Sequence, residues 1–123
     1  MDLTQKHCVP CEGGTPPFSK EQEEKYSNET PSWILDREQV HKIKKRFSFK
    51  NFKDAIQFVN KVALLAEEEG HHPDMCISYN KIEFMLFTHA VGGLSENDFI
   101  LAARIDKLDK ASEKVQQKIL TVV

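Results

Sequence analysis

The stretch FKDAIQFVNKVALLAEEEG, residues 52–70, carries the clearest structural signal in this chain. Its apolar side chains recur at steps of three and four residues, which is the spacing of one helix face: Phe52, Ala55, Ile56, Val59, Val62, Ala63 and Ala66. Gly70 follows at once, and glycine commonly ends a helix because it adopts the left-handed conformation without strain. The pattern predicts a long amphipathic helix that stops at Gly70.

Two β-strands joined by a tight turn are expected after this helix. Residues 75–79 and 82–89 have strand-like patterns on either side of Asn80, a residue type that tolerates the conformation of tight turns. Successive side chains of a strand point to opposite faces. One face of the hairpin is therefore expected to pack on the core, and it consists of Ile77, Tyr79, Ile82, Phe84 and Leu86.

The turn also predicts which residues of the two strands face one another. With a two-residue loop at positions 80 and 81, the register carried outward places His72 opposite His89. Directly opposed side chains have Cβ atoms about 5 Å apart, so two imidazoles there could hold one small group. Alternation places His89 on the face away from the core, where a substrate could reach it.

Capping patterns predict two further helices. Ser19 followed by Gln22, and Ser95 followed by Asp98, match the capping box of a helix N-terminus. The first helix is expected to end before Pro31. The second contains a set of apolar residues with roughly helical spacing: Phe99, Leu101, Ala102, Ala103, Ile105 and Leu108.

Two more strands are expected between the first two helices. They lie around residues 32–35 and 41–49, with a turn over residues 36–39. The complete order is then α-β-β-α-β-β-α. This order predicts an α+β fold in which helices pack on one face of a four-stranded, largely antiparallel sheet.

The chain divides into three regions. Proline and glycine punctuate residues 1–18 too often for regular structure, so we expect an irregular arm whose deletion would leave the fold and most activity intact. Residues 19–109 form the predicted domain. Residues 110–123 form a C-terminal tail that is weakly helical in pattern.

Composition narrows the class of protein. A chain of 123 residues is long enough for one core, and a net charge of −2 argues against nucleic-acid binding through bulk charge. A local basic cluster is best explained as a solvated strand edge: Lys42, Lys44, Lys45, Arg46, Lys50 and Lys53. No apolar run is long enough to span a membrane and the N-terminus lacks a secretion signal, so we expect a cytoplasmic protein.

Three of the five histidines, His71, His72 and His89, are concentrated around the predicted hairpin. Histidine exchanges protons near neutral pH, so the cluster indicates acid/base chemistry or a metal site. Zinc is the weaker reading, because His71 and His72 are adjacent and would point to different sides of a strand. A structural or surface role suits His7, His41 or His71 taken alone, but fits the three clustered histidines together less well.

Two other motifs have ordinary explanations. Cys8 and Cys11 form a Cys-x-x-Cys pair that could be half a zinc site or a redox pair, but an exposed pair of thiols fits the proline-rich context better. Gly92 and Gly93 could bind an anion before a helix, although a tight loop between strand and helix is the simpler reading.

Several motifs in this order resemble the pterin-4a-carbinolamine dehydratase family over about residues 32–108. They are Phe49-x-x-Phe52, Ala66-Glu67, His71-His72-Pro73-Asp74, Tyr79-Asn80-Lys81, Thr88-His89, Gly93-Leu94-Ser95 and Asp98. The arm, with Lys6 to Gly14, is similar to the N-terminus of bacterial members. Met75 departs from the large aromatic residue that animal members carry after this His-His-Pro-Asp motif.

The resemblance implies a lyase that dehydrates 4a-hydroxytetrahydropterin to quinonoid dihydropterin, with no metal or organic cofactor. The family's active-site histidines correspond to His71, His72 and His89. We favour His71 and His89 for proton transfer and His72 for holding the pterin. Whether His72 also shares the role of base is left open. The expected substrate-binding residues are Glu67, Pro73, Asp74, Thr88, Trp33 and Asp98, where Trp33 could cover the ring or be buried in the core.

The resemblance also bears on partners. It implies a homodimer or homotetramer and a link to phenylalanine hydroxylase, one of the aromatic amino-acid hydroxylases that release this pterin. We expect no membrane or direct nucleic-acid partner. The alternative is an interaction module, because animal members also act as transcriptional coactivators; retention of all three histidines favours the enzyme.

Overall fold

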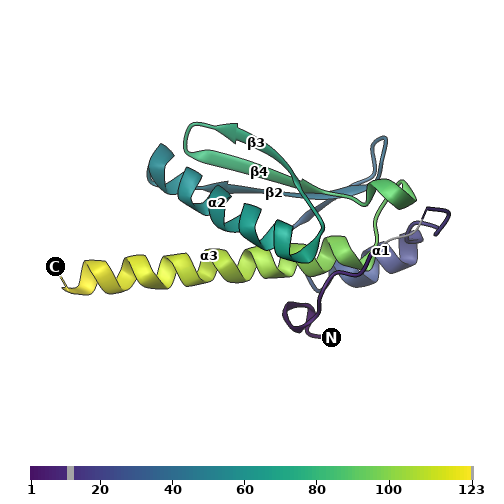
Figure 1. The fold of residues 1–123 in the computed structure, drawn as a ribbon, viewed down its shortest axis with the longest axis horizontal. Helices are drawn as coiled ribbons and strands as arrows, with labels where there is room; N and C mark the ends of the chain where they lie inside the picture. Colours follow the sequence, from purple (N-terminus) through teal and green to yellow (C-terminus); the bar gives the residue numbers. More distant parts are fainter. Residues whose placement is uncertain (11–12, 123) are drawn as a thin grey trace.

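The computed structural model describes residues 1–10 and 13–122, and only the backbone for residues 111–122. One antiparallel sheet has the strand order β1-β2-β4-β3. The strands are β1 (Ile34–Asp36), β2 (Lys42–Ser48), β3 (Asp74–Ser78) and β4 (Lys81–Leu86). The helices are α1 (Lys20–Ser27), α2 (Phe52–Glu69) and α3 (Glu96–Val122), and the 3₁₀ turns are η1 (Leu3–Gln5) and η2 (His89–Val91). The predicted order and the α+β class are confirmed, and α2 and α3 lie on the same side of the sheet (Figure 1).

The helix α2 begins and ends as its sequence predicts, but its buried face is rotated: Ala55, Val62 and Ala66 of the predicted face are buried, and Phe58 and Leu65 join them. Asn51 caps its first turn, and Gly70 ends it with φ 63°, in the left-handed region. Phe52 and Ala63 are exposed, so their predicted place on the buried face is wrong. Aromatic packing explains the rotation, because Phe58 lies against Phe47 and Phe84 of the sheet. The buried residues are Ala55, Phe58, Val62, Leu65 and Ala66.

The β3–β4 hairpin forms, but its predicted register is wrong by two residues. Ile77 pairs with Ile82, so the loop consists of Tyr79 and Asn80. Tyr79 takes the left-handed conformation, with φ 53°. The reason lies outside the hairpin: the Asn80 side-chain amide donates to the Phe49 carbonyl, and the Phe49 N–H donates to the Asn80 carbonyl, both at 2.8 Å. These bonds hold Asn80 against the end of β2.

The new register also removes the predicted pairing of His72 with His89. The strand β3 begins at Asp74, and β4 ends at Leu86, so neither histidine belongs to the ladder. His89 instead opens η2, which ends at Gly92 with φ 71°. The chain then returns to pair Gly93 with Thr88. This is the tight connection from strand to helix that the sequence predicts for the two glycines.

The N-terminal arm is irregular apart from η1, but it packs against the domain. Leu3 is only 3% exposed and belongs to the hydrophobic core. The Phe18 N–H donates to the Leu94 carbonyl at 2.8 Å, and Cys8 packs against the core from outside. These contacts give a physical reason to expect that deletion of residues 1–18 would destabilise the domain, contrary to the expectation from the sequence. Cys11, the second residue of the Cys-x-x-Cys pair, lies outside the described residues.

The helix α3 runs to Val122, so the tail at 110–123 largely continues this helix. Across residues 1–10 and 13–122, none of the helices is both long and apolar enough to cross a membrane.

Candidate active site

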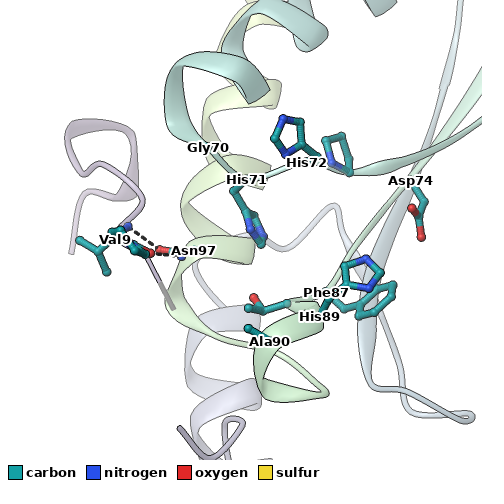
Figure 2. A pocket seen from close by; sticks show the side chains of 12 residues that line it. Val9, Gly70, His71, His72, Asp74, Phe87, His89, Ala90 and Asn97 are labelled. Atoms are coloured by element: carbon teal, nitrogen blue, oxygen red, sulfur yellow. Dashed lines mark hydrogen bonds between the residues drawn. The ribbon is translucent and has the colours of Figure 1, made fainter. Parts of the chain in front are cut away.

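A cavity of about 330 Å³ lies where the α2–β3 connection, the end of β4 and the N-terminal arm meet (Figure 2). This volume is at the lower end of the range for small-molecule sites. Its lining residues come from these three segments and, with Asn97, from the first turn of α3: Val9, Pro10, Gly70, His71, His72, Pro73, Asp74, Phe87, Thr88, His89, Ala90 and Asn97.

His71 is the most firmly held histidine of this cavity. Its Nε2 lies 2.6 Å from Oδ1 of Asp98, and the side chains are 11% and 0% exposed. The left-handed Gly70 turns the chain at the end of α2, and Figure 2 shows His71 extending from this turn toward the η2 side of the cavity. Since a carboxylate only accepts hydrogen bonds, Nε2 carries the hydrogen. The proton that His71 can exchange with a ligand is therefore the one at Nδ1.

The second oxygen of Asp98 is also fully engaged. Oδ2 accepts from the Thr88 hydroxyl and from the Ser95 N–H, each at 2.9 Å. Thr88 gives its only hydroxyl hydrogen to Asp98, so at 2.7 Å it accepts the hydroxyl hydrogen of Ser95. The bond from the Ser95 N–H is half of the capping box predicted from the sequence, and the same carboxylate orients His71.

His72 lies in a different environment from its neighbour. Its side chain is 59% exposed, and its Nε2 lies 3.7 Å from Oε2 of Glu67, which is itself well exposed. Figure 2 shows the two rings on different sides of the α2–β3 connection, as expected for adjacent residues in extended backbone. Pro73 follows and restricts His72 to such a backbone. His72 thus lines the outer edge of the cavity.

His89 faces the cavity from η2 and packs on Phe87. The two ring centroids are 4.2 Å apart, and the rings are tilted by 44°. Strand alternation places Phe87 on the same face as His89, so the sequence contained a signal for Phe87 that the predicted site residues do not include. The aromatic ring limits the orientations of the His89 imidazole and adds an apolar surface to the cavity.

The other predicted site residues divide into two groups. Pro73, Asp74 and Thr88 line the cavity, and Asp98 lies directly behind it. Trp33 is buried outside the lining, where its ring N–H donates to Asp106 at 3.1 Å. The structure therefore places Trp33 in the core and outside the lining of the cavity.

Besides Gly70, Phe87 and Ala90, which adjoin predicted lining residues in the chain, three further lining residues were not predicted: Val9, Pro10 and Asn97. They come from the arm and from the first turn of α3, and nothing in their spacing connects them with the histidines. Within the described part of the chain, no three histidine, cysteine, aspartate or glutamate side chains are placed to hold a metal ion.

This α+β domain has a histidine-lined cavity and a buried histidine–carboxylate pair, which are the groups that an enzyme of the acid/base class uses for proton transfer. A sequence model of the family described as Pterin 4 alpha carbinolamine dehydratase matches residues 16–108. The chain belongs to this family.

Bacterial relatives match almost over their full length. A protein of Rubrobacter xylanophilus is 44% identical over 107 residues, covering 87% of this chain and 98% of the relative. One of Halorhodospira halophila is 48% identical over 108 residues, covering 88% and 98%. Both are named provisionally as pterin-4-alpha-carbinolamine dehydratases.

Solved structures show a similar fold. The crystal structure of a transcriptional coactivator/pterin dehydratase from Brucella melitensis has a TM-score of 0.70 and 26% identity, covering 75% of this chain and 97% of that one. A pterin dehydratase-like protein described as a RuBisCO assembly factor in the alpha-carboxysome has a TM-score of 0.54 and 27% identity, covering 63% and 88%.

Proposed function

We propose that this protein is a lyase that dehydrates 4a-hydroxytetrahydropterin to quinonoid dihydropterin. The observation that carries the proposal is the meeting of His71 and His89 on one cavity, with His71 bonded at 2.6 Å to the buried Asp98. Family membership supports the same reaction.

The reaction needs one acid and one base. The C4a–O bond breaks, and the hydroxyl group takes a proton from the acid and leaves as water. The proton on N5 passes to the base, and the electron pair of the N5–H bond becomes the second bond between C4a and N5. Two imidazoles on one cavity can perform both transfers without a metal or an organic cofactor.

His71 is suited to be the base. With its Nε2 hydrogen donated to Asp98, its Nδ1 has a lone pair for the N5 proton. The imidazolium that forms would then be stabilised by the adjacent carboxylate, as in other histidine–carboxylate pairs.

His89, on the other side of the cavity, is then the acid that protonates the leaving hydroxyl. Phe87 supports its ring and offers an apolar surface to the pterin. His72, near Glu67 at the outer edge, binds the pterin and contributes less to the proton transfers.

The substrate and assembly follow from the same proposal. Aromatic amino-acid hydroxylases, such as phenylalanine hydroxylase, release 4a-hydroxytetrahydropterin, so we place the protein beside such an enzyme in the cytoplasm.

We also propose a homodimer or homotetramer, because the edge strand β3 carries the exposed Ile77, and the loop that follows it carries the exposed Tyr79.

The test is a stopped assay with chemically generated 4a-hydroxytetrahydropterin, corrected for spontaneous dehydration. His71→Ala and His89→Ala should each reduce kcat by about 10²–10⁴-fold, the usual contribution of a positioned acid or base. His72→Ala should raise KM at least as much as it lowers kcat. Folded His71 and His89 variants with wild-type rates would refute the assignment.

Chelation separates this mechanism from a zinc mechanism. Imidazole acid/base catalysis predicts an unchanged rate after treatment with a chelator and a bell-shaped pH profile, with one histidine protonated and another neutral. Loss of activity that added zinc restores would point to a metal at His71, His72 and His89.

An interaction role is the second candidate function. It is favoured by the similarity to the Brucella melitensis structure described as a transcriptional coactivator/pterin dehydratase. A folded wild-type protein without dehydratase activity would support it over the enzyme.

A further inference from the structure

Thr88 lines the cavity and is bonded to the buried Asp98 behind it. Only 4% of Thr88 is exposed. Its hydroxyl donates to Asp98 Oδ2 at 2.9 Å and accepts from the Ser95 hydroxyl at 2.7 Å. A threonine hydroxyl has a single hydrogen. This hydrogen is committed to Asp98, so a ligand in the cavity cannot receive it unless the bond to Asp98 breaks.

The bonds of Thr88 belong to a continuous chain that ends at the proposed base. The Ser95 hydroxyl donates to Thr88, and Thr88 donates to one oxygen of Asp98. The other oxygen of Asp98 accepts from His71 Nε2 at 2.6 Å. Asp98 is 0% exposed, so protein donors and not bulk water share its charge. Each donor that binds Oδ2 leaves less negative charge on Oδ1 for the imidazole.

The bond from Thr88 to Asp98 is a strong one in this setting. Hydrogen bonds to an ionised acceptor are about twice as strong as those between neutral groups. Apart from His71, the described side-chain and backbone donors to Asp98 are the neutral Thr88 hydroxyl and the Ser95 N–H. Loss of the hydroxyl would therefore remove one of two neutral donors from Oδ2 and increase the charge that faces His71.

The backbone of Thr88 has a separate task, because it holds the start of η2. The Thr88 N–H donates to the Gly93 carbonyl at 2.8 Å, and the Thr88 carbonyl accepts from the Gly92 N–H at 3.1 Å. Valine is branched at Cβ like threonine and keeps both backbone bonds. A change of Thr88 to valine therefore removes the hydroxyl and retains the shape and the backbone contacts of this residue.

We propose that Thr88, supported by Ser95, is a positioning residue that acts on His71 through Asp98. This inference rests on the proposed function, and it differs from the role in substrate binding that the family resemblance implies for Thr88. The base must be neutral at the start of each turnover and must regain that form after it takes the N5 proton. By drawing charge toward Oδ2, the Thr88 hydroxyl lets Asp98 orient the imidazole without holding it in the protonated form.

The experiment measures kcat and KM against pH for the wild type and Thr88→Val, in the assay corrected for spontaneous dehydration. The low-pH limb of the profile reports the base, and in Thr88→Val it should move to higher pH by about 0.5 to 1 unit. The kcat value at the optimum should fall about three- to tenfold because the imidazole is less firmly oriented, while KM changes by less than about twofold.

Two further variants at the hydroxyl chain grade this effect. Ser95→Ala keeps the Ser95 N–H bond to Asp98 and the Thr88 hydroxyl, so its limb should move in the same direction by a smaller amount. Thr88→Ser keeps the hydroxyl and should return the limb toward its wild-type position. Ser95 is partly exposed, so Ser95→Ala decides the question if Thr88→Val fails to fold.

Thr30→Val is the matched control. Thr30 is 2% exposed and its hydroxyl donates to the Tyr26 carbonyl at 3.4 Å, but it does not line the cavity. Its substitution removes an equally buried hydroxyl and should leave kcat and the pH profile as in the wild type.

Other ionisable groups near the pair are identical in all these variants. They are His72, Asp74 and His89 on the cavity, and Glu69, Arg104 and His7 at the end of α2. A difference between the wild type and Thr88→Val therefore reports the hydroxyl. NMR titration of isotope-labelled imidazole nitrogens, with the His71 signal assigned as the one missing in His71→Ala, should show the same displacement without turnover.

The outcomes separate this inference from the proposed function. A raised KM with an unmoved pH profile in Thr88→Val would show that the hydroxyl binds the substrate and would overturn the inference. An equal displacement in Thr30→Val would overturn it as well, because the effect would then be a general one. An inactive wild type would refute the proposed function, and the NMR titration would then decide alone whether Thr88 acts on His71 through Asp98.

Discussion

Among the described residues, two carboxylates whose side chains are at most 1% exposed are each bonded to a histidine. Asp98 lies 2.6 Å from Nε2 of His71, and Glu23 lies 2.7 Å from Nδ1 of His41. Their side chains are 0% and 1% exposed. The two pairs are nearly the same in distance and in burial of the carboxylate, although the His41 side chain is 35% exposed and the His71 side chain is 11% exposed.

Their remaining partners and their positions differ. The other oxygen of Asp98 accepts from neutral donors, and His71 lines the cavity. The other oxygen of Glu23 accepts from the Arg37 guanidinium at 2.9 Å, and this cluster joins α1 to the connection between β1 and β2. A buried histidine–carboxylate pair is therefore no sign of catalysis by itself. Its position on a cavity, and the absence of a neutralising cation among the described partners of Asp98, distinguish the candidate catalytic pair.

Asp98→Asn should have the largest effect, and it tests whether the His71–Asp98 pair is catalytic. The asparagine oxygen can still accept from Thr88 and Ser95, but its NH₂ group then faces His71 and forces Nε2 to become an acceptor. The hydrogen moves to Nδ1, and the base loses its lone pair. We expect kcat to fall by about 10²–10⁴-fold, as when a histidine is held in the wrong tautomer.

Glu23→Gln is the matched control for this loss. It removes one negative charge from an equally buried carboxylate that is bonded to a histidine, but His41 is not a lining residue of the cavity. Its kcat and its pH profile should remain those of the wild type. Equal losses of kcat in both variants would mean that general destabilisation, and not the His71 tautomer, causes the effect.

Local patterns predicted the helices and strands and their order along the chain, but not how segments distant in the sequence meet. The capping box at Ser95 and Asp98 is visible in the sequence because its residues are three positions apart. The hairpin register was not predictable, since it depends on the contact of Asn80 with Phe49 on another strand. A periodic sequence pattern indicates local geometry, but it does not indicate which distant residues are in contact.

The site was predictable to the same extent. The histidines and Asp98 were expected from clustering and from family resemblance, whereas the bond between His71 and Asp98 depends on how α2 meets α3. The arm was misjudged because a single residue, Leu3, anchors its start, and one apolar residue makes no pattern. Asn97 carried no signal because its partners are backbone atoms of Val9.

The Glu23→Gln variant, which should keep its activity, should lose stability. Glu23→Gln removes the ion pair with Arg37, but both Arg37 and His41 are about one-third exposed and can be hydrated. We therefore expect a loss of about 2 kcal/mol, below the full cost of breaking a buried pair. Thermal and urea unfolding would measure it. A change below about 0.5 kcal/mol would show that Glu23 is dispensable for packing.

A third carboxylate extends the comparison to a partly exposed site without a histidine. Glu96 accepts from the Tyr26 hydroxyl at 2.5 Å and from Lys6 at 3.1 Å. The Tyr26 bond, followed by Lys6, lowers the pKa of Glu96 below its usual value of 4.5. The same bond, with burial, raises the pKa of Tyr26 from 10.0 to about 12. The pair joins α1 to the first turn of α3.

Tyr26→Phe should have the smallest effect of these substitutions, about 1 kcal/mol at neutral pH, because Glu96 is partly exposed and keeps Lys6. The lowered pKa of Glu96 means that its contribution is present above about pH 4.5 and is lost as the pH falls through the folded-state pKa. The raised pKa of Tyr26 means that its contribution is present below pH 10 and is lost as the pH rises toward 12. The difference in unfolding free energy between the wild type and the variant should therefore be greatest between these limits and shrink on both sides. A difference that stays constant from pH 3 to pH 7 would show that packing of the ring edge, and not the hydrogen bond to the ionised Glu96, accounts for the stability that Tyr26 provides.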